Sequence, residues 1–388
     1  MSSTPIGLYV HLPWCVRKCP YCDFNSYEAR GALGEHAYVD ALLCDLDSEL
    51  TRMAKPAVGS VFIGGGTPSL FSAAAIARLL EGLAARSDFV DGVEITLEAN
   101  PGSAETARFR GYLEAGVNRL SIGIQSFDAG HLRRLGRVHD AREAHAAIEI
   151  ARAAGCANLN LDLMFGLPQA APLDSLRDLE QAITHGPEHL SWYQLTLEEG
   201  TAFAQKPPPL PEHDQICDDY EAGLALLAAA GYRQYEISAY ARDGRVARHN
   251  LNYWLFGDYI GIGAGAHGKR TDAMGYVWRT ARIRHPERYQ KAARDGNALL
   301  SEERVSGATL ATEFMLNALR LAEGFDLALF TARTGLALTT IAAPLASAVA
   351  RGWLEDAGAR LRPSPLGYRF LNDLQLLFTA LDEPALVA

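Results

Sequence analysis

Short apolar runs alternate along the first half of the chain with longer segments in which apolar residues recur every three or four positions. The runs have the length of strands and are apolar throughout: Gly7–His11, Ser60–Ile63, Val93–Leu97, Arg119–Ile124, Asn158–Leu163 and His189–Leu195. Such strands are typical of a parallel sheet that is covered by helices. The segments between them predict helices at about Glu35–Met53, Ala73–Arg86, Ala104–Ala115, Ala141–Ala154 and Leu173–Thr184. Six strand–helix units in succession predict an α/β protein built as a barrel or a partial barrel.

The pattern changes after about residue 205. A proline-rich link at 206–211 precedes a predicted amphipathic helix, Glu212–Ala230, and an aromatic, glycine-rich region, Tyr232–Trp278. Beyond about residue 301 the pattern predicts two helices and a strand hairpin: Ala308–Leu321, Asp326–Gly335, and the basic segment Trp353–Leu371 with its turn near Pro363–Gly367. Helices followed by a hairpin indicate a winged-helix-like module. We therefore expect three parts: a core at 1–205, an extension that completes the core at 206–300, and a small C-terminal domain at 301–388.

Composition and charge narrow the classes of function. Of the 388 residues, 48% are hydrophobic and 21% are charged, which is ordinary for a folded protein. The formal net charge of −10 argues against a general nucleic-acid binder, which needs a basic face, and disfavours an RNA-modifying enzyme. The N-terminus lacks the pattern of a signal peptide, and no apolar run reaches the length of a spanning helix. We expect a cytoplasmic protein with reduced cysteines, and we leave contact with a membrane surface open.

Three of the six cysteines lie within eight residues: Cys15, Cys19 and Cys22, in a C-x3-C-x2-C pattern. Clustered thiolates repel one another unless a cation holds them, and zinc and iron–sulfur clusters are the usual holders. A structural zinc site needs four ligands, commonly as two separated pairs, so zinc with His11 or His36 as the fourth ligand is the alternative. Three cysteines in one loop favour a four-iron cluster with one open iron. The remaining cysteines have no partner at ligand spacing and receive no role: Cys44, Cys156 and Cys217.

The cysteine loop directly after the first predicted strand resembles that of the radical S-adenosylmethionine (SAM) superfamily. Further segments resemble one branch of it, the oxygen-independent coproporphyrinogen III oxidase-like family: Gly64–Ser69, Glu98–Pro101, Gly123–Phe127, Asp162–Pro168, His249–Trp254 and Gly261–Gly268. The resemblance implies a partial (β/α)6 radical SAM barrel with a C-terminal helical, winged-helix-like module. It also implies a [4Fe–4S] cluster on the three cysteines, with the methionine moiety of SAM on the open iron.

Polar residues at the ends of the predicted strands are the candidates for SAM binding. Glu98, Gln125 and Asp162 lie at or just beyond three successive strand ends, the edge that carries chemistry in barrel folds. The glycine run follows another strand, and glycine lets a backbone approach a ligand closely; without the cysteine loop it would be read as an ordinary tight turn. By resemblance, the full set of positions that match SAM-binding residues is Tyr9, Tyr21, Gly65, Gly66, Thr67, Glu98, Gln125, Arg137 and Asp162.

Two departures separate this chain from the true oxidases of the family. The oxidases carry another cysteine two residues past the third ligand, where this chain has Phe24. They also carry a long segment ahead of the first cysteine, which helps to close the active site, whereas only 14 residues precede Cys15 here. Both departures match the heme chaperones of the family. We therefore expect a protein that binds heme and delivers it to a client hemoprotein, and we keep an oxygen-independent coproporphyrinogen III dehydrogenase as the alternative.

His249 is the candidate heme ligand, with His267 as a weaker second candidate. Neutral imidazole is a common ligand of heme iron, and the neighbouring Tyr253 and Trp254 could pack on a porphyrin. A lone histidine is, however, more often a hydrogen-bonded structural residue than a ligand.

Overall fold

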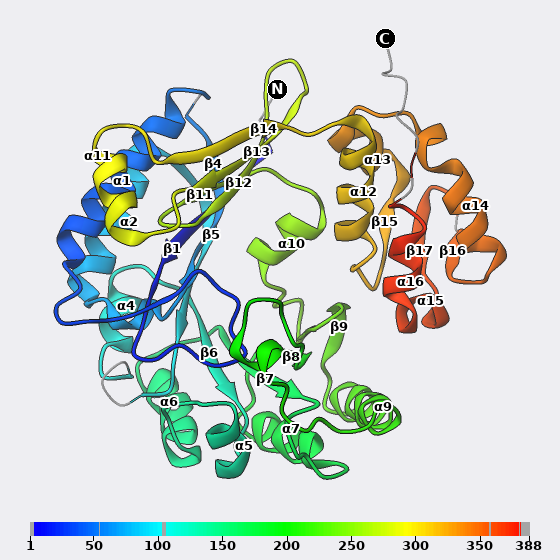
Figure 1. Cartoon of the computed structure of the whole chain (residues 1–388), viewed down its shortest axis with the longest axis horizontal. Coiled ribbons are helices and arrows are strands. Elements are labelled where there is room, and N and C mark those ends of the chain that lie inside the picture. The colour runs from blue at the N-terminus through cyan, green and yellow to red at the C-terminus, as the bar shows by residue number, and fades with distance from the viewer. Residues whose placement is uncertain (1–3, 54, 103–105, 357, 380, 382–388) are drawn as a thin grey trace.

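A twelve-stranded sheet is the largest element of the computed structural model, which describes residues 4–53, 55–102, 106–356, 358–379 and 381. Its centre is a curved parallel sheet of seven strands (Figure 1). In spatial order they are β11 (Tyr259–Ile262), β1 (Ile6–Leu12), β4 (Ala57–Gly65), β5 (Asp88–Ala99), β6 (Arg119–Gln125), β7 (Leu159–Phe165) and β8 (His189–Gln194).

Antiparallel strands extend the parallel sheet at both edges. Beyond β11 lie β12 (His267–Thr271), β13 (Val277–Arg282) and β14 (Leu299–Arg304), and beyond β8 lie β10 (Ala239–Ala241) and β9 (Arg233–Glu236). The parallel strands therefore do not close on themselves, because β11 and β8 each pair with an antiparallel strand instead. The result is the partial barrel that the sequence predicts, with β11 as a seventh parallel strand that the sequence pattern did not reveal.

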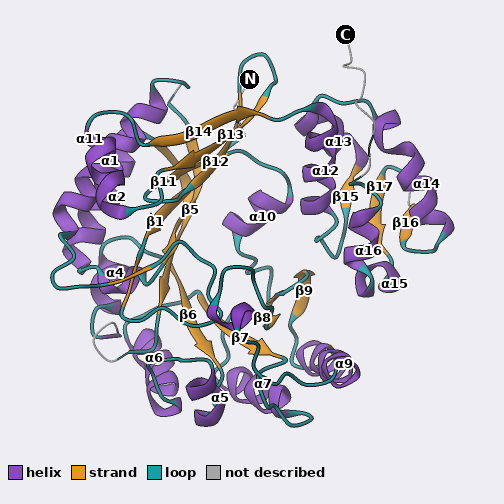
Figure 2. Cartoon of the chain, in the orientation of Figure 1, coloured by secondary structure: helices purple, strands orange, loops and turns teal. Residues whose placement is uncertain are grey.

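Helices cover the outer face of the curved sheet (Figure 2). They are α1 (Glu35–Leu50), α2 (Ala73–Arg86), α4 (Phe109–Glu114), α5 (Ala129–Arg134), α6 (Ala141–Ala153), α7 (Asp174–Thr184), α9 (His213–Ala229) and α11 (Pro286–Arg294). Two short elements, η1 (Pro68–Leu70) and α8 (Ala202–Gln205), follow β4 and β8 along the chain. Alternate strand residues such as Leu120 and Ile122 are fully buried in the apolar core. Because side chains alternate along a strand, the residues between them, such as Ser121, face the barrel interior.

The predicted strands and helices are confirmed, with boundaries that move by a few residues. The exception is the predicted helix at Ala104–Ala115: α4 begins only at Phe109, and positions 104 and 105 lie outside the described residues. Helix α6 shows why such predictions succeed. Asp140 and Glu143 form a capping box at its start, and its apolar positions face the core.

The C-terminal module has its own apolar core. Helices α12 (Gly307–Ala318), α13 (Leu327–Thr334), η2 (Leu338–Ile341), α14 (Ala342–Ala350), α15 (Pro365–Arg369) and α16 (Leu371–Leu376) surround a three-stranded antiparallel sheet of β15 (Phe325–Asp326), β17 (Arg360–Pro363) and β16 (Leu354–Asp356). The predicted hairpin turn near Pro363–Gly367 is wrong. The strands reverse between Asp356 and Arg360, and the Ser364 hydroxyl caps α15 at the predicted turn.

Helix α10 (Arg248–Trp254) lies between the sheet and the C-terminal module and contacts β1, β4 and α12 (Figure 1). The division of the chain at residues 205 and 300 stays a prediction.

Within the described part of the chain, no single helix is both long and apolar enough to cross a membrane; one sharply bent pair, Leu327–Thr334 with Leu338–Ala350, passes that test by length and composition.

Candidate functional site

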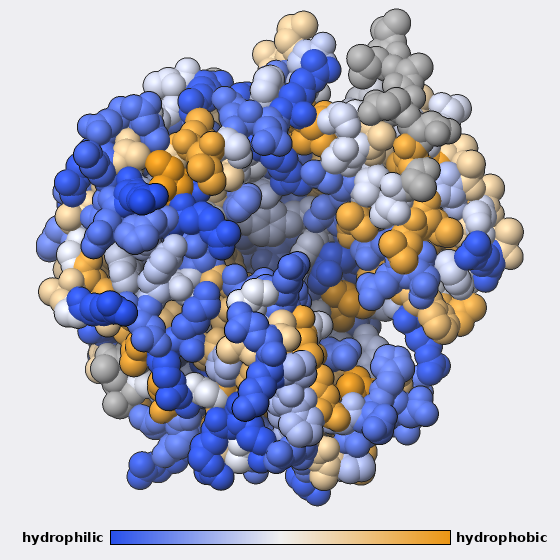
Figure 3. All heavy atoms as spheres, viewed as in Figure 1, coloured by the Kyte–Doolittle hydropathy of each residue, from blue (hydrophilic) through white to orange (hydrophobic). Residues whose placement is uncertain are grey.

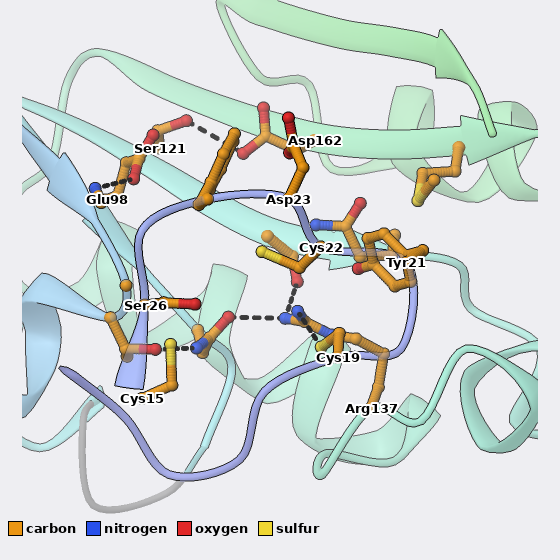
Figure 4. Close-up of a pocket in the computed structure, with 18 of the residues that line it drawn as sticks. Cys15, Cys19, Tyr21, Cys22, Asp23, Ser26, Glu98, Ser121, Arg137 and Asp162 are labelled. Carbon is orange, nitrogen blue, oxygen red and sulfur yellow. Dashed lines mark hydrogen bonds between the residues drawn. The ribbon is translucent and has the colours of Figure 1, made fainter. Parts of the chain in front are cut away.

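A cavity of about 370 Å³ opens at the carboxyl-terminal end of the parallel strands. Its walls come from the loop after β1, the ends of β4 to β8, and the loop after α5 (Figure 4). The loop after β1 is fixed by β2 (Trp14–Cys15) and β3 (Tyr27–Glu28), which pair in parallel. Distant parts of the sequence therefore meet around one hollow, as expected for the end of a barrel that carries chemistry.

Cys15, Cys19 and Cys22 are free thiols that line this cavity. Burial raises the pKa of the Cys15 thiol, and the nearby hydroxyls of Thr67 and Ser26 oppose that rise. A buried thiolate needs a cation, and a metal supplies one. The three thiols form a wall that is open toward the cavity and not a closed four-ligand cage: among the described residues, no three Cys, His, Asp or Glu side chains are placed to hold one metal ion.

Arg137 places a guanidinium beside the cysteine wall (Figure 4). Its Nη1 donates to Cys19 Sγ at 3.6 Å, and its Nη2 donates to the Gly123 carbonyl at 2.8 Å and to Asn100 Oδ1 at 2.5 Å. Asn100 Nδ2 in turn donates to Thr67 Oγ1 at 2.9 Å. Three partners therefore hold a positive charge in contact with the sulfur of Cys19.

The glycine run packs directly against the cysteine loop. The amides of Gly66 and Thr67 donate to the carbonyls of Leu12 and Trp14 at 2.8 and 2.7 Å. A Cβ on Gly66 would lie 2.5 Å from the Trp14 carbonyl oxygen, and Gly65 has a φ of 117°. These positions require glycine because no side chain fits between the two loops.

Glu98 and Asp162 lie at the floor of the cavity, where the carboxyl groups interact electrostatically. Glu98 Oε2 accepts from the Gly65 amide at 3.2 Å, and Asp162 accepts from Ser121 Oγ at 3.1 Å and Asn160 Nδ2 at 2.8 Å. Burial and the nearby Asp162 charge raise the pKa of Glu98 to about 8, and burial also raises the pKa of Asp162. Paired carboxylates whose pKa values are raised in a cavity mark a candidate ligand site.

Gln125 ends β6 in a strained conformation. Its φ is 68°, a value that non-glycine residues rarely adopt, and the register with β7 shifts at this point. Tyr193, from the end of β8, donates to Gln125 Oε1 at 2.7 Å and fixes the amide. Such strain persists where surrounding contacts impose it, often at ligand sites. Tyr21 lines the opposite side and packs on Phe203.

The structure thus brings eight of the nine predicted SAM positions to one cavity. Tyr9 is outside its lining: its hydroxyl donates to His11 Nδ1 at 2.8 Å, deeper in the barrel. Sequence reasoning gave no role to Asn100, Ser121 or Tyr193, which also line the cavity. Asn100 lies in a segment that had been recognised, whereas Tyr193 could have been found only from its place at the end of β8.

The hypothesis that His249 binds heme iron is not supported by its surroundings. The side chain is 1% exposed, at the amino-terminal end of the strands, and its ring stacks on Phe62. Its Nδ1 hydrogen-bonds Ser60 Oγ at 2.9 Å and its Nε2 hydrogen-bonds the Tyr253 hydroxyl at 2.8 Å. Both nitrogens therefore have partners inside the protein, and neither is free for iron. His267 is exposed, and its candidacy stays untested.

Comparisons with known proteins agree with this geometry. The model of the radical SAM superfamily matches residues 9–179, and that of the HemN C-terminal domain matches 305–370. The heme chaperone HemW of Escherichia coli is 48% identical over 376 residues, covering 97% of this chain and 98% of that protein. The chain belongs to the HemW family of radical SAM proteins.

HemW of Haemophilus influenzae is 46% identical over 378 residues, with 96% of this chain and 98% of the relative covered. The fold is that of coproporphyrinogen III oxidase HemN from Escherichia coli, with a TM-score of 0.82, 23% identity, and 97% and 90% of the two chains covered. The radical SAM fold of the HemW family implies a [4Fe–4S] cluster and SAM. In this chain, the candidate residues for these groups are the three cysteines, the glycine run and the paired carboxylates, which line one cavity.

Proposed function

We propose that this protein is a heme chaperone that binds heme and passes it to a client hemoprotein, and that it carries a [4Fe–4S] cluster and SAM. The observation that carries the proposal is the near full-length similarity to proteins named as heme chaperones, combined with the cysteine wall. We expect no decarboxylation of coproporphyrinogen III. The cytoplasmic location stays a prediction.

The cluster would be held by the thiolates of Cys15, Cys19 and Cys22. The open side of this wall faces the cavity, so a cluster there would present its fourth iron to a ligand inside. Arg137, through its bond to Cys19 Sγ, would offset part of the negative charge of the thiolates. When bound, the cluster would supply a redox-active iron with an open coordination position.

SAM would lie between the glycine run and the carboxylates. Gly65, Gly66 and Thr67 line the cavity, and their amides are already bonded within the fold. The carbonyls of the run would therefore be the groups that accept a hydrogen bond from the amino group of the methionine moiety. Glu98 and Asp162 can accept from hydroxyl or amino groups, and a cationic ligand such as a sulfonium would favour their ionised forms. Gln125 and Arg137 complete the lining.

The rim of the cavity supports the chaperone over the oxidase. Phe24 lines the mouth and is 55% exposed, at the position where the oxidases of the family place an extra cysteine. Radical decarboxylation needs a dry pocket, and an exposed rim lets water in. The HemN-like fold and C-terminal domain favour the second candidate, an oxygen-independent coproporphyrinogen III dehydrogenase.

One sample distinguishes these two functions. The full chain is reconstituted anaerobically with iron and sulfide, and heme binding is followed by the Soret band. Coproporphyrinogen III decarboxylation is then assayed with SAM and a reductant. We expect heme binding and transfer to an apo-hemoprotein, without decarboxylation. Many turnovers of decarboxylation, or no association with heme, would contradict the chaperone and favour the dehydrogenase.

A further inference from the structure

Arg119, the first residue of β6, is a buried cation without a partner. It is 2% exposed, its Nε has no hydrogen-bond partner, and no hydrogen bond or ion pair joins its side chain to the part of the chain that the structure describes. Two other buried cations behave differently: Lys269 pairs with Asp258 at 2.7 Å and Arg282 with Asp45 at 2.9 Å. Burial of an unpaired charge lowers the stability of a folded protein by several kcal/mol. The presence of an arginine at this buried position therefore needs an explanation.

The strand register places Arg119 directly beneath the paired carboxylates. Arg119 lies opposite Thr96 of β5, and two residues further along, Ser121 lies opposite Glu98. Because side chains alternate, Arg119 points to the same interior face as Ser121, whose hydroxyl donates to Asp162. Thr96 Oγ1, on the neighbouring strand, also has no hydrogen-bond partner among the described residues. Two unpaired donors therefore lie one layer below the floor of the SAM cavity.

The charged and titratable groups that face Arg119 come from five elements: Glu94 and Glu98 of β5, Asp162 of β7, His189 of β8, Tyr235 of β9 and His249 of α10. Glu94 is already satisfied by the amides of Arg248 and His249, at 3.1 and 3.2 Å.

His189 hydrogen-bonds Asn160 Oδ1 and the Tyr235 hydroxyl. Burial lowers the pKa of His189 and of His249 well below 6.5. The histidines of this layer are therefore neutral near pH 7, and the positive charge below Glu98 and Asp162 is that of Arg119.

We propose that Arg119 is a positioning residue whose charge favours the ionised forms of Glu98 and Asp162, and so sets the pH range in which the cavity accepts SAM. The proposal rests on the proposed SAM function. Two buried carboxylates close together cannot both stay charged without a counter-ion. A guanidinium serves this purpose because it carries a delocalised positive charge with several donors in a fixed geometry.

The electrostatics of the cavity agree with this role. The positive charge of Arg119 lowers the pKa of Glu98 and of Asp162, against the opposing effect of burial. Glu98 nevertheless has a pKa of about 8. Loss of the Arg119 charge should raise the pKa of both carboxyls further, so that a higher pH is needed to ionise them and to make them strong hydrogen-bond acceptors.

The test uses the full, cluster-bearing protein and the variants Arg119→Met, Arg119→Gln and Arg119→Lys, with Arg142→Met, which removes an exposed cation, as the matched control. The infrared band of protonated carboxyl groups is titrated without SAM and assigned with Glu98→Gln and Asp162→Asn. SAM binding is measured by calorimetry between pH 6.5 and pH 9. Arg119→Gln keeps the test open should the methionine variant fail to fold.

We expect the protonated-carboxyl band to persist to a pH about one unit higher in the methionine and glutamine variants than in the lysine variant. Their SAM affinity should fall about tenfold at pH 7 and approach that of the unchanged protein near pH 9. Identical carboxyl titrations, or an affinity loss that is the same at every pH, would overturn the proposal. Absence of SAM binding in the unchanged protein would refute the SAM function, while the infrared titration would still decide the role of Arg119.

Discussion

The two ends of the barrel use the same kinds of side chain for opposite purposes. At the amino-terminal end of the strands, α10 seals the interior, and His249 and Glu94 each use both polar atoms on partners inside the protein. At the carboxyl-terminal end, Glu98 and Gln125 line a cavity, and each has one side-chain oxygen bonded within the fold while the rest of its polar group has no bonded partner among the described residues. Figure 3 shows that the molecule is hollowed near its centre, with polar residues gathered around the recess.

This difference shows how to separate a structural polar residue from a functional one. Burial alone does not do so, since Gln125 and His249 are both buried. The two kinds of residue differ in how many of their polar atoms already have hydrogen-bond partners within the fold. A residue whose polar atoms all have such partners contributes to packing. A residue that lines a cavity and has polar atoms without partners is available to bind a ligand.

The largest expected effect is the loss of the cluster from the carboxyl-terminal end of the strands, which is the open end because the cavity lies there. Cys15→Ser, Cys19→Ser and Cys22→Ser should each abolish the full complement of iron and sulfide after anaerobic reconstitution, because a three-cysteine wall has no spare ligand. Cys44→Ser is the control, since Cys44 lies on α1 outside the cavity. If any of the three variants retained the full cluster, that cysteine would not be a ligand, and the open end would not differ from the sealed end in the way proposed.

At the sealed end, the change with the largest expected cost is His249→Ala. It leaves a cavity under Phe62 and removes partners from Ser60 and Tyr253, so we expect the free energy of unfolding to fall by about 3 kcal/mol. Denaturant titration of the cluster-bearing protein measures this loss. Heme affinity of the folded variant should be unchanged; a selective loss of heme binding without destabilisation would restore His249 as a ligand.

Much of the open end could be predicted from the sequence, for physical reasons. The spacing of the cysteines and the glycine run is local, and parallel strands bring their ends to one edge, so Glu98, Gln125 and Asp162 had to lie close together. The sealed end could not be predicted in this way. The partners of His249 come from β4 and from the next turn of its own helix, and only the path of α10 beneath the barrel shows that they meet.

The next largest effect is expected on SAM affinity. Asp162→Ala removes an acceptor that Ser121 and Asn160 hold in place, and Glu98→Ala removes the partner of the Gly65 amide. Each should weaken binding by about 1–3 kcal/mol, the usual loss for a polar partner in a cavity, as measured by calorimetry. Glu143→Ala, on the outer helix α6, is the control. Unchanged affinity in both cavity variants would place SAM elsewhere.

A smaller effect concerns the pH dependence of stability at the sealed end. Burial lowers the pKa of His249 to about 3, so its neutral form contributes stability that is complete above pH 6.5 and is lost as the pH falls toward 3. Within that window the slope should reach about 1.4 kcal/mol per pH unit. His249→Gln should lack this contribution, and the difference between the two unfolding curves from pH 5 to pH 7.5 measures it. Parallel curves would show that His249 titrates normally.

The smallest effect is expected at the rim of the open end, where Phe24 is more than half exposed. Phe24→Ala should change the free energy of unfolding by less than about 0.5 kcal/mol, because an exposed ring has little packing to lose. Phe62→Ala, which removes the ring stacked on His249 at the sealed end, should cost about 2 kcal/mol or more. Denaturant titrations of the two variants compare the same substitution at the two ends. Equal costs would mean that Phe24 packs as part of the core, and that the rim is as closed as the floor.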